Sequence, residues 1–411
     1  MKRAIASVAT LLLGVAILLA GQGLQIVLLP VRATLEQFSA LGVGYIGALY
    51  FLGFTFGCWK GSELLRRAGH VRTFGAMTAV ASAVPLLHGL WVNLWTWGIM
   101  RFATGFCFAV LYVVIESWLN ERSTDENRGT VFSVYIVINM TMIAVGQQML
   151  LLADPKALDL FAVASMLVSL AAVPVLMSRR EEPQQIEESY FSLKMMYQNS
   201  PTGMLGSLTS GMTNGAFWAL APVFAVAVTQ EVAMAAWFMS AVVIGGAVGQ
   251  WPLGWWSDRT DRRIVLIVAC AAATIVGVIL WQLAPRISAL GILALGSLWG
   301  ALAFPVYSVS VAQANDRAEP GTFVMISSGL LLMYGLGAVA GPFISSGVMT
   351  LIGDGGLFLF AAFGHLALTV YIILRLRSEK YEEDEEQTEF SEALTSALTT
   401  SQVYTRSVEH E

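Results

Sequence analysis

Two charged side chains stand inside long apolar stretches of the sequence, and their chemistry is the first guide to function. Arg101 and Glu116 share one charge-poor run, 97–119, and lie 15 residues apart. On a helix that rises 1.5 Å per residue, this separation is about 22 Å. A carboxyl group in such a place can be protonated or charged, so we predict that Glu116 is a protonation site. The alternative is an ion pair of Glu116 with Arg122, Arg128 or another loop arginine.

Residues that often form catalytic or metal sites do not occur in matching patterns. The three cysteines, Cys58, Cys107 and Cys270, all lie in apolar runs, where a disulfide or redox role is not expected. The four histidines are scattered without metal-ligand spacing. The sequence has no phosphate-binding loop, no nucleophile elbow and no constellation of histidines with carboxylates. It therefore predicts a protein that is not an enzyme and that has no cofactor or metal site.

The composition indicates the class of protein to which the chain belongs. Hydrophobic residues make up 56% of the 411 residues and charged residues only 12%, whereas soluble domains carry about 25% charged residues. A surface that faces water needs ionised side chains, and a surface that faces lipid does not. Because a helix of about 20 apolar residues crosses a bilayer, we predict an all-α membrane protein whose transmembrane helices position Arg101 and Glu116.

Twelve charge-poor runs have this length, six on each side of a polar stretch. They lie at 4–31, 39–58, 73–94, 97–119, 129–152, 158–177, 202–228, 232–256, 264–284, 288–312, 322–350 and 356–374. The first run also resembles a signal peptide, but its apolar part is longer than a usual signal core. The predicted domains are an N-terminal six-helix bundle (1–178), a cytoplasmic linker (179–201), a C-terminal six-helix bundle (202–377) and an acidic, disordered cytoplasmic tail (378–411).

The basic residues of the loops predict the orientation. If both termini lie in the cytoplasm, all but four of the 23 Lys and Arg residues fall in cytoplasmic segments. The exceptions are Arg101 within a run and Arg32, Lys156 and Arg286 in outer loops. Since cytoplasmic loops carry the excess of basic residues, we predict a multi-pass protein of the inner or plasma membrane with both termini in the cytoplasm. The tail holds ten acidic and two basic residues, which indicates a solvated end and leaves a partner-binding role open.

The two halves of the sequence resemble each other. A shift of 192 residues aligns FLGFTFGCW, which starts at Phe51, with VIGGAVGQW, which starts at Val243. A shift of 195 residues aligns RFATG with GSLWG and YVVIESWLNER with YSVSVAQANDR. In the last pair four positions agree in order: Tyr112, Asn120, Glu121 and Arg122 with Tyr307, Asn315, Asp316 and Arg317. A repeat of six helices is parallel, and transporters built from such repeats bind their substrate near the bilayer midplane, between the halves.

One loop resembles the signature of the major facilitator superfamily. The segment GWWSDRTDRR, which starts at Gly254, is similar to the loop motif G-x-L-x-D-R-x-G-R-R. The matching residues are Gly254, Asp258, Arg259, Arg262 and Arg263, while Asp261 stands where glycine is usual. The copy in the first half, SELLRRAGHVR, keeps Leu64, Arg67 and Gly69 but has Arg66 in place of the aspartate. The segments VVIESWLNERS and YSVSVAQANDRA also resemble the YcaD-type branch of this superfamily.

This resemblance implies a fold and a mechanism. It implies twelve helices in two pseudo-symmetric six-helix bundles, which move a small solute by alternating access when the halves rock. It also implies that Asp258 latches the cytoplasmic side against the start of the fifth helix, near 128–130, as part of the arginine-rich motif. An aspartate there gains from the partial positive charge of a helix N-terminus. The alternative is a simple turn and helix cap.

The resemblance further implies which residues line the cavity between the halves. In this superfamily the first, fourth, seventh and tenth helices surround it. The predicted substrate residues are therefore Gln22, Gln25, Arg101, Asn214, Trp218 and Tyr307. One arginine with several amides and aromatic rings suits a small neutral, zwitterionic, weakly anionic or amphipathic solute. It suits a polyphosphate poorly, because several basic groups would be needed.

Three functions stay open at this point. The predicted function is that of a monomeric secondary active transporter, coupled to protons through Glu116, whose partners are a small solute and membrane lipid but no nucleic acid. The first alternative is a transport-inactive membrane scaffold or assembly factor, which the acidic tail and the degenerate first loop favour. The second is an importer of copper or another metal ion, with soft methionine ligands. The methionines considered are Met195, Met196, Met204 and Met212.

Overall fold

The computed structural model describes residues 2–124, 127–177, 197, 199–318 and 323–378. Within these ranges the chain forms helices and turns, and no strand occurs. The first half contains α1 (Lys2–Leu35), α2 (Ala40–Ala68), α3 (His70–Leu90), α4 (Leu94–Glu121), α5 (Arg128–Gln148), the short 3-10 helix η1 (Met149–Leu152) and α6 (Asp159–Leu176). The second half contains α8 (Pro201–Thr229), α9 (Ala233–Ser257), α10 (Arg262–Leu283), η2 (Ala284–Arg286), α11 (Ala289–Ala303), α12 (Pro305–Asn315), α13 (Phe323–Ile352) and α14 (Gly356–Ser378). Most of the predicted linker and nearly all of the predicted acidic tail lie outside the described residues.

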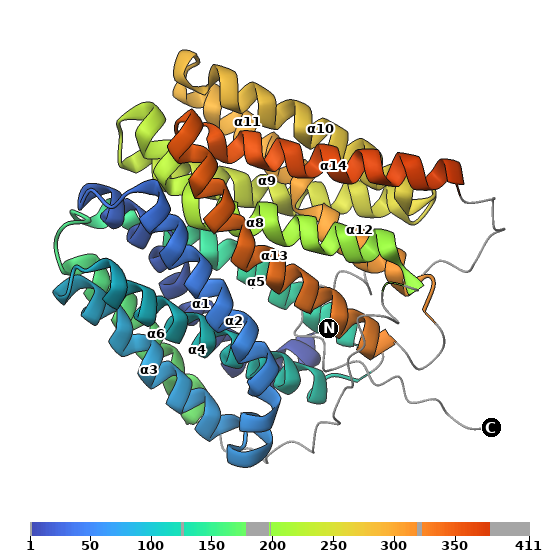
Figure 1. The fold of residues 1–411 in the computed structure, drawn as a ribbon. Helices are drawn as coiled ribbons and strands as arrows, with labels where there is room; N and C mark the ends of the chain where they lie inside the picture. Colours follow the sequence, from blue (N-terminus) through green and yellow to red (C-terminus); the bar gives the residue numbers. More distant parts are fainter. Residues whose placement is uncertain (1, 125–126, 178–196, 198, 319–322, 379–411) are drawn as a thin grey trace, which may run out of the picture.

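Twelve of the described segments are long and apolar enough to cross a membrane, which confirms the number predicted from the sequence. α11 and α12 together form one of these segments, Ala289–Asn315. The segments run side by side in alternating directions, so the turns gather at two ends of the bundle (Figure 1). We call the end at which α1 begins and α14 ends the terminal end, and the opposite end the far end.

Polar residues and one glycine set the helix boundaries at the turns. At the far end, the side chains of Ser39, Asn93 and Ser288 accept hydrogen bonds from backbone N–H groups at the starts of α2, α4 and α11. These N–H groups have no partner within their own helix, so such caps stabilise the helix start. At the terminal end, Gly69 separates α2 from α3 with a φ of 77°, which glycine adopts without strain. The glycine of the degenerate loop motif therefore forms a tight turn.

The tenth span is not a single helix. α11 ends at Ala303 and α12 starts at Pro305, which lacks an N–H group and whose ring clashes with the carbonyl group four residues earlier. In the first half the equivalent helix, α4, runs unbroken over 28 residues. The break leaves Phe304 between α11 and α12, where its ring centroid lies 5.8 Å from that of Trp218 on α8.

Close helix crossings repeat between the halves in the register that the sequence predicts. Where α2 crosses α4, a Cβ atom added to Gly53 would lie 2.0 Å from the carbonyl oxygen of Phe102. Where α9 crosses α11, a Cβ atom added to Gly245 would lie 2.0 Å from the carbonyl oxygen of Ser297. The two glycines are 192 residues apart and the two carbonyl groups 195, which are the shifts found in the sequence.

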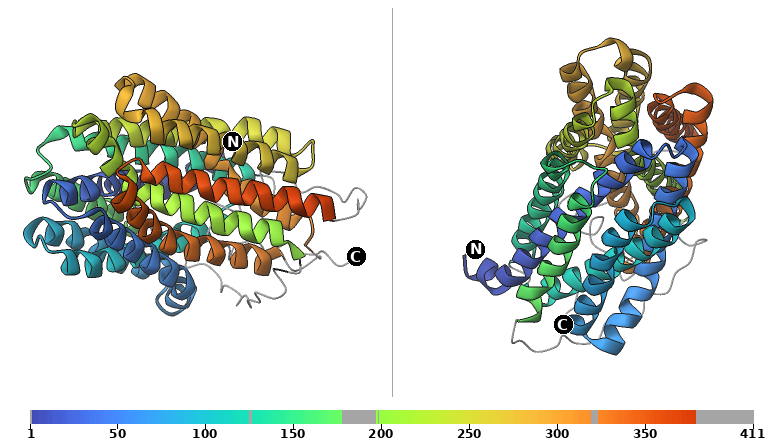
Figure 2. Two further views of the ribbon diagram at one scale, coloured as in Figure 1. Left: turned by 45° about the horizontal axis from the view of Figure 1, so that its top comes forward. Right: turned by 90° about the vertical axis from the view of Figure 1, so that its left-hand side faces the viewer.

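The pairing of α1 with α5 likewise repeats as the pairing of α8 with α13. A Cβ atom on Gly146 would lie 2.1 Å from the carbonyl oxygen of Ala20, and one on Gly341 would lie 2.0 Å from that of Met212. Figure 2 shows the two groups of helices, blue to green and green to red, lying side by side. The fold is therefore two pseudo-symmetric six-helix bundles, as predicted.

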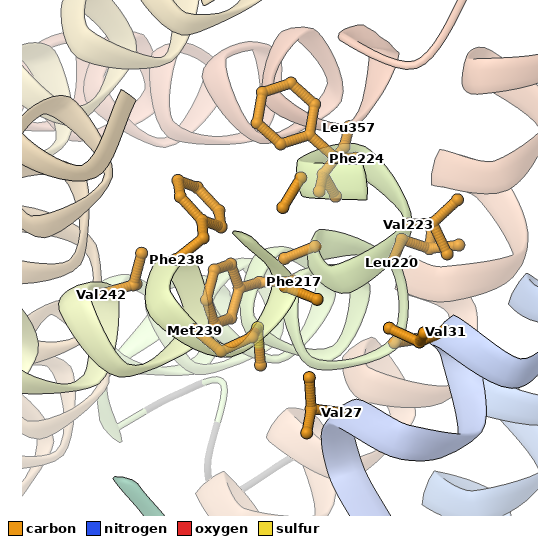
Figure 3. Packing of buried hydrophobic residues seen from close by; sticks show 14 of the residues in the cluster. Val27, Val31, Phe217, Leu220, Val223, Phe224, Phe238, Met239, Val242 and Leu357 are labelled. Atoms are coloured by element: carbon orange, nitrogen blue, oxygen red, sulfur yellow. The ribbon is translucent and has the colours of Figure 1, made fainter. Parts of the chain in front are cut away.

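The halves share a hydrophobic core toward the far end and have separate cores toward the terminal end. Val27 and Val31 of α1 belong to one buried cluster with Leu220 and Val223 of α8 (Figure 3). Toward the terminal end, the buried residues of the first half form one cluster and those of the second half form two others. Among the described residues, Trp218 is the one side chain of the second half that packs against the first-half cluster. The apolar contact between the halves is thus concentrated at the far end.

Candidate functional site

Glu116 is fully buried on α4. The hydroxyl group of Tyr135 on α5 donates a hydrogen bond to its Oε1 atom, with 3.3 Å between the two oxygens. A charged side chain inside a membrane helix costs about 2.5–3.5 kcal/mol on insertion scales. The protonated form avoids this cost, whereas the charged form gains more from the hydrogen bond of the tyrosine. These surroundings suit a carboxyl group that changes its protonation state.

Polar side chains continue from Tyr135 toward the middle of the first half. Asn139 lies one helical turn along α5, and its side chain is near the hydroxyl groups of Tyr135 and Tyr112. Tyr112 lies on α4, four residues before Glu116. Residues four apart share a face of a helix. Tyr112 and Glu116 therefore lie on one face of α4, and Tyr135 and Asn139 lie on one face of α5.

Gln22 carries the connection from α4 through α1 to α2. Its Oε1 atom accepts a hydrogen bond of 2.8 Å from the hydroxyl group of Tyr112. Its Nε2 atom donates a hydrogen bond of 3.1 Å to the hydroxyl group of Tyr50. The amide group therefore has a partner at each end, and it links three helices of the first half with one buried side chain.

Arg101 lies at the other end of this series of contacts. Its guanidinium carbon is 4.1 Å from the ring centroid of Tyr50, which is a cation–π contact. Within the described residues, no carboxylate oxygen comes within 4 Å of the guanidinium group. The side chain is half-buried. A single aromatic ring thus supplies the protein contact that the structure shows for this charge.

Seven residues together form what we call the polar chain. They are, in order, Arg101, Tyr50, Gln22, Tyr112, Asn139, Tyr135 and Glu116. The sequence predicts Arg101, Gln22 and Glu116 as separate site residues, and Tyr112 only as a repeated position. It does not predict Tyr50, Tyr135 or Asn139. The one available signal is that Tyr135 and Asn139 are four residues apart in an apolar run and so share a helix face.

The second half contains a shorter counterpart. The hydroxyl group of Tyr334 on α13 lies near the side chain of Asn214 on α8, and the ring centroid of Tyr334 is 4.7 Å from that of Tyr307 on α12. By the shifts of 192 and 195, Asn214, Tyr307 and Tyr334 occupy the positions of Gln22, Tyr112 and Asn139. The positions of Arg101, Tyr50, Tyr135 and Glu116 hold, in this order, Gly296, Val242, Leu330 and Val311. These four residues carry neither charge nor hydroxyl group. The Oδ1 atom of Asn214 has no hydrogen-bond partner in the described part of the chain.

Next to this counterpart, four aromatic rings pack together. We call them the aromatic cluster: Phe217, Trp218, Trp299 and Phe304. Phe217 and Trp299 are fully buried, whereas Trp218 and Phe304 are half-buried. Gly246 makes room for Phe304, since a Cβ atom there would lie 2.4 Å from its ring. The helix break and this glycine together place an aromatic ring beside Trp218.

Gln25 is a predicted cavity residue that stands apart from the polar chain. Its Nε2 atom donates a long hydrogen bond of 3.4 Å to the carbonyl oxygen of Gly21 on its own helix. Its Oε1 atom has no hydrogen-bond partner among the residues that the structure describes. The side chain is 2% exposed, so it contributes a buried acceptor group to α1. Its role in binding stays a prediction.

Arg262 is the centre of the loop motif at the terminal end. Its buried side chain donates a hydrogen bond of 2.7 Å to Asp316, and further bonds of 3.1 Å to Ser257 and 3.2 Å to Asp258. These contacts join the end of α9, the start of α10 and the end of α12. The ion pair seen for Asp258 is therefore within its own half. The latch between Asp258 and the start of α5 stays a prediction.

The other motif arginines have neighbouring partners. Arg263 forms an ion pair of 2.9 Å with Asp261, whose side chain also caps α10. Arg259 donates a hydrogen bond of 3.0 Å to the carbonyl oxygen of Trp255 and lies over its ring. In the first-half copy, Arg67 pairs with Glu63.

The repeated tetrads end equivalent helices. Asn120 and Glu121 are the last residues of α4, and Arg122 follows. Asn315 is the last residue of α12, and Asp316 and Arg317 follow.

In the described part of the chain, no three His, Cys, Asp or Glu side chains gather in a way that could hold a metal ion.

Polar contacts also join the halves near the far end. The Nε2 atom of Gln148 on α5 donates hydrogen bonds of 2.7 Å to Ser240 and 3.1 Å to the carbonyl oxygen of Ala236, both on α9. The hydroxyl group of Ser240 in turn lies 3.1 Å from Oε1 of Gln147. On the other side of the seam α2 meets α13, where a Cβ atom on Gly44 would lie 2.6 Å from the carbonyl oxygen of Pro342. We call these the far-end contacts.

The sequence has clear relatives among known proteins. The family model of the Major Facilitator Superfamily matches residues 11–320 and, in a second match, residues 203–408. A protein of Shigella flexneri serotype 5b (strain 8401) called uncharacterized MFS-type transporter YcaD is 25% identical over 353 residues, which cover 85% of this chain and 90% of that protein. The protein of the same name from Escherichia coli O17:K52:H18 (strain UMN026 / ExPEC) is also 25% identical over the same lengths.

Solved structures resemble the fold over nearly its whole length. The nucleoside transporter NupG has a TM-score of 0.77 at 12% identity, over 91% of this chain and 99% of NupG. A bacterial homologue of the human lysosomal transporter Spinster, in an inward-facing and occupied conformation, has a TM-score of 0.73 at 13% identity, over 92% of this chain and 98% of that one. The transporter FucP in the outward conformation has a TM-score of 0.58 at 13% identity, over 92% and 100%.

The family match covers more than half of the chain. The relatives are YcaD-type transporters, as the resemblance of the helix-end segments predicts. The solved structures have a similar fold. A multi-pass membrane transporter, not an enzyme, is the class of protein that these findings support. The chain belongs to the Major Facilitator Superfamily.

Proposed function

We propose that this protein is a secondary active transporter that moves a small solute by alternating access and couples the movement to protons through Glu116. The observation that carries the proposal is the polar chain. It connects a fully buried carboxyl group to Gln22 and Tyr112, whose counterparts Asn214 and Tyr307 stand at equivalent positions in the second half. In this proposal the protein is a monomer of the inner or plasma membrane, both termini lie in the cytoplasm and the far end faces outward.

Glu116 suits proton coupling because a change in its protonation alters both charge and hydrogen bonding. The carboxylate accepts the hydrogen bond of Tyr135, and Tyr135 lies next to Asn139 of the polar chain. A buried carboxylate is stable only with such partners or with water. A rocking motion that admits water to this region favours release of the proton, and one that excludes water favours its uptake. The polar chain is the means by which solute and proton affect each other.

The distribution of contacts between the halves supports the alternating-access part of the proposal. The halves share one apolar core toward the far end and have separate cores toward the terminal end. The far-end contacts of Ser240 and Gln148 close the same end with hydrogen bonds. We assign this arrangement to an inward-facing state. The outward-facing state then requires the far-end contacts to break and the cores at the terminal end to meet.

The proposal is tested with the purified protein in liposomes that enclose a pH-sensitive dye. Solutes from a broad panel are added one at a time, and a substrate is recognised because protons move with it. Glu116→Gln should abolish proton movement and uphill accumulation but keep the exchange of labelled for unlabelled substrate, since the amide imitates the protonated acid. Glu63→Gln is the matched control, because Glu63 pairs with Lys60 and Arg67 on the last turns of α2.

Two outcomes would refute this function. If no solute moves with protons in the wild-type protein, proton-coupled transport is wrong. If Glu116→Gln keeps normal substrate-driven proton movement, the coupling residue is a different one.

A further inference from the structure

We infer that the transported solute is a monoanion with an apolar body, and that its anionic group binds Arg101. This inference rests on the proposed function, because it names the class of substrate for the same site. It follows from three features of the described residues: a half-buried cation with no carboxylate oxygen within 4 Å, the ion pairs of other buried or half-buried cations in the spans, and an aromatic surface on the facing half.

Glu116 does not balance the charge of Arg101. The two residues are 15 positions apart on the unbroken helix α4, which is about 22 Å. The five members of the polar chain between them are uncharged side chains. Among the described residues, Arg101 has no carboxylate oxygen within 4 Å. A half-buried cation is partly shielded from water, so a bound anion would supply an ionic interaction that the described residues do not.

The donor groups of Arg101 are available to such an anion. Its contact with Tyr50 runs through the face of the ring, at 4.1 Å, and uses none of the five N–H groups of the guanidinium. The side chain is half-buried, so part of it remains accessible. Two parallel N–H groups of a guanidinium match the two oxygens of a carboxylate, and such a pair is stronger and more specific than a neutral hydrogen bond.

The number of such cations limits the charge of the solute. Other buried or half-buried basic residues of the spans have a carboxylate partner: Arg32 pairs with Glu36 at 2.8 Å, Lys60 with Glu63 at 3.0 Å and Arg262 with Asp316 at 2.7 Å. A dianion or polyphosphate would bring at least one negative charge that no residue of the polar chain can neutralise. The geometry therefore favours one carboxylate-like group.

The second half offers a surface for the rest of the solute. Trp218 and Phe304 are half-buried, and Trp218 packs against both the shared core and the first-half cluster. In the first half, Phe54 lies beside Tyr112 with 6.1 Å between the ring centroids. Aromatic rings bind apolar bodies through large contact areas. A solute with one anionic end and one aromatic or aliphatic end satisfies both surfaces at once.

The inference is tested by binding to the purified protein in detergent, where no gradient is needed. The probes are phenylacetate with its uncharged partner phenylacetamide, octanoate with octanamide, and the cation phenethylamine. Thermal unfolding and calorimetry report binding. At least one carboxylate should raise the melting temperature, and its amide should not. Arg101→Gln should weaken carboxylate binding about 10- to 100-fold, the effect of one charge-assisted pair.

Two variants serve as controls. Arg101→Lys keeps the charge and should retain part of the affinity, because an ammonium group binds a carboxylate without the matched fork. Arg286→Gln removes the same charge from an exposed position at the far end and should leave binding unchanged. If Arg101→Gln does not fold, the preference for carboxylate over amide in the wild-type protein and the behaviour of Arg101→Lys decide the question.

Several results would overturn the inference. The first is that the amides or the amine bind as tightly as the carboxylates. The second is that no carboxylate binds. The third is that Arg101→Gln keeps the full affinity for carboxylates. Carboxylate binding without any proton-coupled transport would refute the proposed function and leave the charge of the ligand as inferred. Proton-coupled transport of uncharged solutes alone would support the proposed function and refute the inferred charge of the solute.

Discussion

The first half carries Arg101 and Glu116 on one unbroken helix, whereas the second half has Gly296 and Val311 at the equivalent positions of α11 and α12. The backbones nevertheless cross in the same way, with glycines against carbonyl groups at matching positions. The second half instead breaks its helix at Pro305 and places Phe304 beside Trp218. The first half thus holds the two charged ends of the polar chain, and the second half holds the aromatic cluster beside a shorter, uncharged counterpart.

This comparison shows which features a duplicated membrane fold repeats. Glycines at the crossings must repeat, because any side chain there would push the helices apart. Side chains away from the crossings are not restricted in this way. They can differ between the halves without disturbing the crossings. A pseudo-symmetric scaffold can therefore hold an asymmetric site, with the proton group in one half and the apolar surface in the other.

The largest expected effect comes from placing a carboxyl group in the second half. Val311→Glu should destabilise the protein by about 3 kcal/mol, because Val311 is 1% exposed and Leu330 stands where Tyr135 supports Glu116. Unfolding of the purified protein in SDS or by heat measures the loss. Glu116→Val is the reverse control, and it should retain stability while losing proton coupling. Wild-type stability of Val311→Glu would show that the second half accepts a charge as readily as the first.

The glycine crossings should respond alike in both halves. Gly53→Ala and Gly245→Ala should each lower stability by about 1–3 kcal/mol, since the added methyl group meets a carbonyl oxygen in both cases. Gly347→Ala on α13 is the control, because a Cβ atom there has no neighbour within 4 Å. Unfolding by heat compares the three variants. Clearly unequal losses at Gly53 and Gly245 would argue against equivalent crossings.

The smallest expected effect distinguishes the two repeated tyrosines. Tyr112→Phe should cost about 1 kcal/mol, because it removes the hydrogen bond of 2.8 Å to Gln22. Tyr307→Phe should cost less, since its ring stacking on Tyr334 persists and no described side chain bonds its hydroxyl group. Stability in SDS and substrate-driven proton movement are measured for both. Equal effects on both quantities would mean that Tyr112 and Tyr307 contribute alike.

Much of the fold could be predicted because its causes are local. Each span needs an apolar run of sufficient length, and the number of spans follows by counting. The crossings could be aligned because Gly53 and Gly245 sit in similar segments. The repeated tetrads could be placed at helix ends for the same reason. Gly69, which the loop motif singled out, proved to form the turn between α2 and α3.

The connections within the candidate site could not be predicted in the same way. Arg101, Gln22 and Glu116 stand out as polar residues in apolar runs, but Tyr50 and Tyr135 are ordinary residues of membrane helices. The link from Tyr135 to Glu116 depends on the rotation of α5 against α4, which two separate runs do not specify. The motif likewise identifies Arg262, yet its bond to Asp316 joins residues 54 positions apart.

The sequence by itself determined the membrane-spanning class, the number of helices, the duplication and the family, because lipid and close backbone packing limit which residues can occur at each position. The tertiary structure alone decided that three scattered polar residues belong to one polar chain, and that the facing half is aromatic. Contacts between helices depend on how whole helices cross and rotate. No single run of residues contains that information.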